Sequence, residues 1–312
     1  MTALRGFATD DDDSPFFLAV GFLKPHLPFI APKRYWDLYD PTTLEITKLR
    51  NPPTGAPVPA TNVVLDELRD SYPWDVRVDP QTGQPVSDDA VYDMPAAGEL
   101  LPEQERRLLH GYYACVSFVD AQVGKITAAL TELGLADDTI VVVWGDHGYH
   151  LGELSLWSKF TNFELGTRSP LVIHDPRIET TVHDTDALVE FIDIYPGLCE
   201  LAGLPPPSHL QGESFAPLLR APDHPGKTAA YSQYPRRDLM GYSVKTDRFR
   251  YTEWREDAGA GAVVGAELYD HAADPDETVN RVEMPAYATH QHSLAGLLAQ
   301  QWPLISSNRT FR

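Results

Sequence analysis

Two apolar stretches in this sequence each lead into polar side chains that could do chemistry. "FFLAVGF" is followed by Lys24 and His26, and "IVVVWG" is followed by Asp146 and His147. A carboxylate oxygen and an imidazole nitrogen side by side make half of a divalent-metal site. Taken alone, an Asp-His-Gly motif is weak, and a turn-capping aspartate beside a surface histidine is the more frequent interpretation.

Both stretches are predicted to be strands of one sheet, which would bring the polar residues together. Residues 16–22 and 139–144 are continuous apolar runs, as expected for buried parallel strands, and 170–174 gives a third. Ligands of open parallel sheets bind beyond the carboxyl ends of the strands. We therefore expect the four polar residues to face one crevice.

The clearest helix prediction covers residues 102–133, where apolar residues recur at helical spacing. Pro102 suits the first helical position, and Gly134 suits a C-cap. A second helix is predicted at 186–203, with Pro196 starting or kinking its second half. The long helix is expected to lie on a face of the sheet.

After about residue 220 the pattern changes to short, aromatic, roughly alternating segments, which predict a small antiparallel sheet followed by a closing helix. The predicted fold class is therefore α/β, with a mostly parallel sheet flanked by helices in residues 1–220. A small α+β subdomain with an antiparallel sheet is predicted for residues 221–312. Residues 50–100, rich in Pro, Gly, Asp and Thr, indicate a long surface excursion.

Composition narrows the class of protein. At 312 residues, 43% hydrophobic and 10% aromatic, the chain is typical of a soluble globular protein, and no apolar run reaches the length of a membrane span. The net charge of -20 argues against nonspecific nucleic-acid binding but does not exclude anionic substrates. No signal-peptide pattern is visible, and the acidic run 10–13 is expected to be a solvated loop. Cys115 and Cys199 are expected to be small buried hydrophobic residues.

The stretch "DHGYHLGELSLWSKFTNFELGTRSPLVIH" resembles the metal-binding block of the sulfatase family, in the alkaline phosphatase superfamily. The shared elements are D-H-G, L-G-E, W-x-K, a glutamate, and R-x-P before an apolar strand. "YYACVSFVDAQVGKI", "LVEFIDIYPGLCELAGLPPP" and "ELYDHAADPDETVN" resemble other parts of the family. Within it, "PFFLAVGFLKPHLPFIAPKRYWDLYDP", "YSQYPR" and "MGYSVKTDRFRYTEW" are most similar to the iduronate-2-sulfatase group.

This resemblance implies roles for individual residues. Asp146 and His147 would bind a divalent cation, Ca²⁺ in most sulfatases, with Mg²⁺, Mn²⁺ or Zn²⁺ as alternatives. Lys159 would contact the sulfate ester, and His26 would donate a hydrogen bond or proton to the leaving oxygen; Lys24 is a weaker candidate for a sulfate contact. Cations and donors aimed at an oxygen that gains charge lower the barrier. The implied partner is a sulfated sugar or other small sulfate ester, with no nucleic acid and no membrane.

The sequence departs from the family pattern in two places. Leu154 stands where a histidine often follows L-G-E. Neither Cys115, followed by V-S-F, nor Cys199, followed by E-L-A, fits the C-x-P-S-R or C-x-A-S-R motif whose cysteine becomes the nucleophilic formylglycine. We therefore expect the chain to lack the first part of a sulfatase, with formylglycine and the remaining metal carboxylates, and to be inactive alone. Sulfatases are usually exported, and an export signal would lie in that part.

Two other functions are compatible with the sequence. Phosphodiester and phosphonate hydrolases of the same superfamily share the metal half-site, and the nucleophile would separate them from sulfatases. A non-catalytic, sulfatase-like binding protein is the other alternative. The intact polar residues count against a binding protein, whereas the missing nucleophile counts for it.

Overall fold

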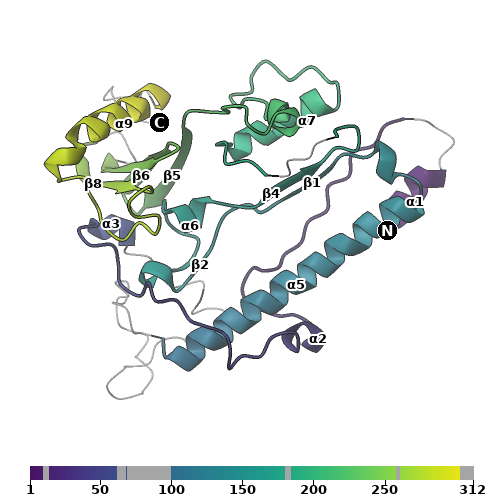
Figure 1. Ribbon diagram of the computed structural model, residues 1–312, viewed down its shortest axis with the longest axis horizontal. Helices are drawn as coiled ribbons and strands as arrows, with labels where there is room; N and C mark the ends of the chain where they lie inside the picture. The colour runs from purple at the N-terminus through teal and green to yellow at the C-terminus, as the bar shows by residue number, and fades with distance from the viewer. Residues whose placement is uncertain (10–13, 62–67, 69–99, 180–183, 258–260, 303–312) are drawn as a thin grey trace.

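The computed structural model describes residues 1–9, 14–61, 68, 100–179, 184–257 and 261–302. The predicted acidic loop at 10–13 and most of the predicted excursion at 50–100 lie outside these residues. Figure 1 shows an elongated molecule with a long helix along one side and a small sheet covered by a helix at the opposite end.

The long helix α5 runs from Pro102 to Glu132, as predicted. Pro102 opens it, and the Gln104 side chain accepts the Leu101 N–H at 2.8 Å. Gly134, at φ +70°, ends it, because the Leu135 N–H reaches the Leu130 carbonyl at 2.8 Å and the Gly134 N–H reaches Thr131. This is the Schellman arrangement, which requires a left-handed residue after the helix and so favours glycine.

Strand β1 (Val141–Trp144) pairs with β4 (Leu171–His174) in a two-stranded sheet. The pairing is antiparallel, with Val143 opposite Val172, so the prediction of parallel neighbours was wrong for these two strands. A parallel pair needs a crossover that carries the chain back to the starting edge. The chain between β1 and β4 instead folds as a loop beyond the end of β1 and returns directly.

Residues 16–22 were predicted to form a strand of this sheet, but in the structure they belong to no sheet among the described residues. The segment still runs in the same direction as β1. At its start Phe16 packs against the cluster of Leu4, Ala129 and Leu130, as Val141 of β1 also does, and beyond its end His26 contacts Lys159 in the loop that follows β1. Figure 1 shows it passing between α5 and the β1–β4 pair.

Helix α7 (Ile194–Leu201) covers the face of the β1–β4 pair that carries Leu171 and Ile173. It is shorter than the predicted helix at 186–203, and a 3₁₀ turn (Phe191–Asp193) precedes it. The Asp193 carboxylate accepts the Glu190 N–H at 2.7 Å and binds Lys227, so the chain before residue 191 is held in a turn.

The C-terminal part has the predicted antiparallel sheet and closing helix. Its four strands lie in the order β5 (Ala230–Arg236), β6 (Leu239–Lys245), β7 (Phe249–Arg255) and β8 (Val263–Asp270). Helix α9 (Ala288–Gln301) buries Leu294 and Leu298 against this sheet. The domain boundary at residue 220 stays a prediction.

The remaining elements are short and connect these parts. They are α1 (Thr2–Thr9), α2 (Lys33–Trp36), α3 (Val58–Thr61), a 3₁₀ turn (Ala136–Asp138), β2 (His150–Leu151), a 3₁₀ turn (Glu153–Ser155), β3 (Trp157–Ser158), α6 (Glu164–Thr167), α8 (Ala216–Arg220) and a 3₁₀ turn (Pro285–Tyr287).

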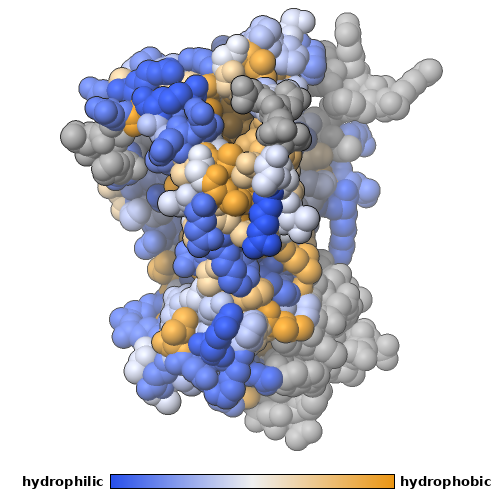
Figure 2. Space-filling model, turned by 90° about the vertical axis from the view of Figure 1, so that its right-hand side faces the viewer, coloured by the Kyte–Doolittle hydropathy of each residue, from blue (hydrophilic) through white to orange (hydrophobic). Residues whose placement is uncertain are grey.

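The surface is mixed in character. Figure 2 shows hydrophobic side chains gathered at mid-height between hydrophilic regions above and below. Among the described residues, no helix combines the length and apolar character that crossing a membrane requires.

Candidate active site

His26 and Lys159, which are 133 residues apart, lie in direct contact. Lys159 Nζ is 3.1 Å from His26 Nε2, and His26 Nδ1 is 2.8 Å from the Leu27 carbonyl oxygen. A carbonyl only accepts, so the Nδ1 must carry the proton, and in the neutral ring the Nε2 then accepts a hydrogen bond from the Lys159 ammonium. The structure therefore brings together two of the residues to which the resemblance assigned catalytic roles.

The loop that carries Lys159 has an unusual backbone. Leu154, Ser155 and Ser158 have φ values of 56°, 64° and 73°, in the left-handed region that side chains other than glycine rarely adopt. Such conformations persist only when the surrounding structure holds them. Here the Leu154 N–H donates to the Leu49 carbonyl at 2.6 Å, and the Ser155 hydroxyl donates to the Arg50 carbonyl.

The same loop is also tied to the C-terminal sheet. The Asn162 side chain donates to the Gly241 carbonyl at 3.1 Å and accepts from the Ser232 hydroxyl at 3.1 Å. The Glu164 N–H donates to the Glu277 carboxylate at 2.8 Å. Lys159 is therefore positioned from both ends of its loop, and one of those supports is the sheet formed by β5–β8.

A buried ion cluster reinforces this connection. Arg250 binds Glu277 at 2.8 Å and also binds Glu164, and His271 lies 2.9 Å from Glu277. Burial alone would raise the pKa of Glu277, but Arg250, the His271 ring and the Glu164 N–H together hold that pKa below its ordinary value. The carboxylate thus stays charged inside the protein because its partners surround it.

Asp146 and His147 follow β1 after Gly145, as the sequence predicts. His147 Nδ1 lies 2.7 Å from the Gly148 carbonyl oxygen, so Nδ1 carries a proton, and in the neutral ring Nε2 keeps its lone pair. Nε2 is 3.6 Å from an Asp146 oxygen, and the Asp146 side chain is 88% exposed. A Cβ at Gly148 would lie 2.1 Å from the Leu165 carbonyl oxygen, so glycine is needed where α6 packs against the site.

The donor set fits a divalent cation only in part. The Asp146 carboxylate and the His147 Nε2 are suitable ligands. Among the described residues, however, no group of three or more potential ligands is present. Calcium takes six to eight oxygens, so a cation at this position would need ligands in addition to these two side chains.

The Lys24 ammonium is occupied by the main chain of the turn that presents His26. It donates to the His26 carbonyl at 2.9 Å and to the Pro28 carbonyl at 2.6 Å. These bonds make Lys24 a support for the turn, and its predicted contact with sulfate stays a prediction.

His150 was not singled out from the sequence, yet it lies fully buried beneath the loop of Lys159. Its Nε2 is 2.8 Å from the Thr161 hydroxyl, and burial lowers its pKa to about 4. Within the described structure its Nδ1 has no hydrogen-bond partner. A two-residue strand such as β2 has no periodicity that could have shown this burial in the sequence.

Leu154, which replaces a frequent family histidine, lies in the apolar core of the loop. It packs in one buried cluster with Phe163, Trp254 and Tyr269. Its place is therefore filled by a hydrophobic contact with the C-terminal sheet.

Neither cysteine is a candidate nucleophile. Cys115 and Cys199 are both buried free thiols, as predicted. Burial raises the pKa of Cys115 to about 11, which keeps it a neutral thiol.

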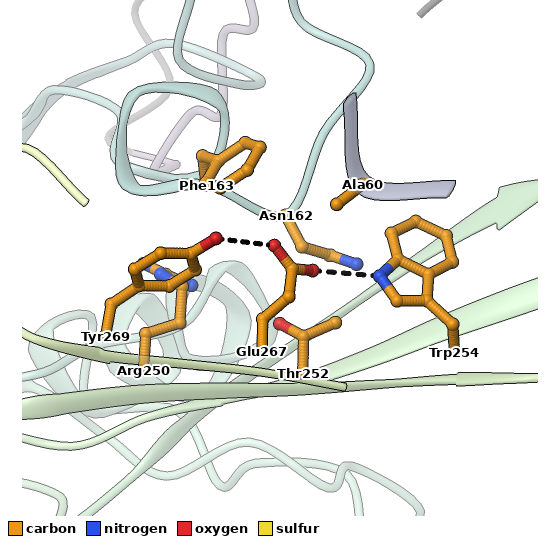
Figure 3. A pocket seen from close by; sticks show the side chains of 8 residues that line it. All are labelled: Ala60, Asn162, Phe163, Arg250, Thr252, Trp254, Glu267 and Tyr269. Carbon is orange, nitrogen blue, oxygen red and sulfur yellow. Dashed lines mark hydrogen bonds between the residues drawn. The ribbon is translucent and has the colours of Figure 1, made fainter. Parts of the chain in front are cut away.

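A second buried carboxylate lies on the face of the C-terminal sheet that meets the loop (Figure 3). Glu267 accepts hydrogen bonds from the Trp254 indole and the Tyr269 hydroxyl, both at 2.8 Å. Burial raises its pKa to about 7. Figure 3 shows Asn162 and Phe163 of the loop above it, so this group supports the loop from below.

The family model for sulfatases matches residues 1–204, and the model described as "N-sulphoglucosamine sulphohydrolase, C-terminal" matches residues 152–302. The chain belongs to the sulfatase family. A sulfatase from Formosa agariphila is 30% identical over 96% of this chain and 52% of its own length. The iduronate 2-sulfatase of Mus musculus is 31% identical over 77% of this chain and 52% of its own length. The chain thus spans about half the length of the curated relatives it matches.

Solved structures show the same fold. A protein in complex with its substrate D-glucosamine-2-N,6-O-disulfate superposes with a TM-score of 0.78 at 22% identity, over 98% of this chain and 69% of that chain. The phosphonate monoester hydrolase of Agrobacterium radiobacter gives 0.68 at 24% identity, over 98% and 59%. The α/β fold class with a C-terminal antiparallel sheet is thereby confirmed.

Proposed function

We propose that this chain forms the leaving-group side of an active site that hydrolyses sulfate esters of sugars, in the manner of iduronate 2-sulfatase. The observation that carries the proposal is the contact between Lys159 and His26 in a member of the sulfatase family. Several relatives and one structural neighbour are named for sulfated sugars, which supports this class of substrate.

Lys159 would provide the charge that the reaction needs. Hydrolysis breaks the bond between sulfur and the sugar oxygen, and that oxygen leaves with increasing negative charge. An ammonium group has three N–H donors and points one of them at His26 Nε2 here, so Lys159 would also donate to the sulfate and the leaving oxygen when substrate is bound. A preorganised cation at that position stabilises the charge as it develops.

His26 would act first as a positioning group. Its Nε2 accepts from Lys159 in the neutral ring, so His26 donates to the leaving oxygen only after it takes up a proton. The proton that the leaving oxygen finally receives comes from this pair. Lys24, bonded to the His26 and Pro28 carbonyls, holds the turn in place.

Asp146 and His147 would supply two of the ligands of a divalent cation, most simply Ca²⁺. When bound, this cation would draw negative charge away from the sulfate. The other ligands and the nucleophile, formylglycine in this family, would come from residues that 1–312 do not contain. We therefore propose that the isolated chain is inactive.

Binding tests the proposal directly. D-glucosamine-6-sulfate should bind more tightly than D-glucosamine in calorimetry, and Lys159→Ala should remove the difference. A hydrogen bond to a charged group contributes about 1.5–3 kcal/mol, or roughly tenfold or more in Kd. Lys125→Ala, on the exposed face of α5, is the matched control and should leave binding unchanged.

Turnover provides the second measurement. The isolated chain should hydrolyse 4-nitrophenyl sulfate no faster than the Lys159→Ala, His26→Ala double variant. Turnover that is lost in Asp146→Ala would show that a residue within 1–312 attacks sulfur. Preference for phenyl methylphosphonate over the sulfate ester in binding would favour the phosphonate-hydrolase alternative, and equal binding of the sulfated and plain sugars would sink both.

A further inference from the structure

Strand β2 places a buried histidine beside the turn that presents Lys159. His150 is completely buried, and in the β2–β3 pair it lies opposite Ser158, the residue before Lys159. Its side chain reaches past Lys159, because its Nε2 is 2.8 Å from the Thr161 hydroxyl oxygen. His150 therefore holds the chain on both sides of Lys159, by strand pairing before that residue and by its ring after it.

The turn at Lys159 needs such support, because its backbone is not relaxed. Ser158 has a φ of 73°, and the Thr161 N–H donates to the Lys159 carbonyl at 2.8 Å, only two residues back. A residue other than glycine stays in the left-handed region only where its surroundings hold it there. The Thr161 hydroxyl is closely confined, since a Cβ added at Gly166 would lie 2.6 Å from its oxygen. Because Thr161 closes the turn, a displacement of its side chain would change the direction of Lys159.

Stability alone does not favour a histidine at this position. The Nδ1 of His150 has no hydrogen-bond partner among the described residues, and burial, opposed by the nearby charge of Glu277, lowers the pKa of the ring to about 4. A buried nitrogen without a partner destabilises the folded state, whereas an apolar side chain would not. The Phe163 ring packs edge-on against the His150 ring, with 6.4 Å between their centroids, so an apolar side chain would find an apolar contact here. What the histidine adds is the hydrogen bond to Thr161.

We propose that the His150–Thr161 hydrogen bond positions the Lys159 ammonium for contact with the sulfate group of the substrate. His150 is completely buried, so it touches no substrate and acts through the turn as a positioning residue. The identity of the anion as a sulfate ester rests on the proposed function. Functional groups of a site must be held within about 0.5 Å of their productive geometry. The 3.1 Å contact between Lys159 Nζ and His26 Nε2 records that placement in the free protein.

A purely structural role of His150 makes a different prediction. If the bond to Thr161 served only to hold the loop in the fold, its removal would lower the Tm and the ligand affinity together. The loop has other supports, such as the bond from Asn162 to the Gly241 carbonyl at 3.1 Å. Replacing both partners of a buried hydrogen bond by apolar groups of similar shape is nearly neutral for stability. The positioning role therefore predicts that the double variant His150→Leu, Thr161→Val keeps or raises the Tm while Lys159 loses its position.

The first test observes Lys159 without a ligand. In protein with ¹⁵N-labelled histidine, the shift of His26 Nε2 responds to the Lys159 ammonium, and Lys159→Ala defines its value without that contact. The double variant should move this shift most of the way to the Lys159→Ala value. His150→Gln, whose amide can reach Thr161 as Nε2 does, should stay near the wild type, and so should the control His290→Leu, at an exposed position on α9. A His26 shift that the double variant leaves unchanged would overturn the proposal.

Ligand affinity and stability complete the test. The preference for D-glucosamine-6-sulfate over D-glucosamine, roughly tenfold in the wild type, should fall to about twofold or less in the double variant. Its Tm should not fall. His150→Gln and Thr161→Ser keep the hydrogen bond and should keep the preference. A preference that survives in the double variant, or one that is lost only together with a lower Tm, would overturn the proposal.

The two proposals can fail separately. Equal binding of the two sugars by the wild-type chain would contradict the proposed function. The His26 shift would still decide whether His150 positions Lys159, because that measurement needs neither ligand nor turnover.

Discussion

Replacing Arg250 with leucine should destabilise the protein more than almost any other single change in the C-terminal sheet. The Arg250 side chain is only 4% exposed and binds Glu277, which is 2% exposed, and Glu164, which is 26% exposed. Removing one partner of a buried ion pair costs about 3–5 kcal/mol, because the other charge stays buried. The bond to the more exposed Glu164 adds at most about 1 kcal/mol. We expect a loss of roughly 4 kcal/mol in the free energy of unfolding.

The pH dependence of that loss has a definite sign. With Arg250 present, the pKa of Glu277 is held below its ordinary value, so this carboxylate adds stability at neutral pH that is lost as the pH falls into the acid range. Without Arg250, burial dominates and raises the pKa of Glu277. The folded variant then binds a proton more readily than the unfolded chain does, so the variant should lose stability as the pH rises through that raised value.

Urea unfolding at pH 5 and pH 8, followed by tryptophan fluorescence and far-UV circular dichroism, measures both effects. Lys33→Met is the control, because the Lys33–Asp37 pair is 85% and 55% exposed and should contribute only about 0.3–0.5 kcal/mol. A loss of less than about 1 kcal/mol for Arg250→Leu, or a loss equal at the two pH values, would refute the reasoning.

Three further predictions concern other parts of the molecule. Burial raises the pKa of Glu267 in the folded protein from its ordinary value of 4.5 to about 7, so the protein should lose stability as the pH rises from about 4.5 to 7. Glu267→Gln can still accept a hydrogen bond from Trp254 and donate one to Tyr269, and it should flatten this dependence of Tm on pH. An unchanged dependence would show that Glu267 does not cause it. Gly148→Ala should lower the Tm, because the added Cβ would lie 2.1 Å from the Leu165 carbonyl oxygen. Gly124→Ala, in open space on α5, should instead stabilise the protein by about 0.5–1 kcal/mol. Equal Tm shifts in the two variants would contradict this contrast. Calcium should bind the isolated chain no more tightly than about 1 mM in calorimetry, since within the described residues no third ligand joins Asp146 and His147. Micromolar binding that Asp146→Ala abolishes would reveal further ligands and contradict this prediction.

Features that depend on neighbours along the chain could be predicted from the sequence. Helix α5 begins at Pro102 and ends before Gly134, because its caps and its apolar face are formed within a few residues of one another. The C-terminal sheet was predictable for the same reason, since its short aromatic segments follow one another along the chain and pair in that order. Asp146, His147 and Lys159 could be named because they lie in one contiguous stretch that resembles the sulfatase motif, whereas His26 was named from a separate stretch 133 residues before Lys159.

The tertiary structure alone decided how distant segments meet. The antiparallel sense of β4 depends on the path of the loop between residues 144 and 171, which no periodicity encodes. The Arg250–Glu277–Glu164 cluster joins residues up to 113 apart, so its burial follows from packing. The apolar character of segment 17–23 was evident in the sequence, but whether a strand is covered depends on its partners. A strand needs neighbours for its hydrogen bonds and apolar side chains, and those neighbours are set by the whole fold.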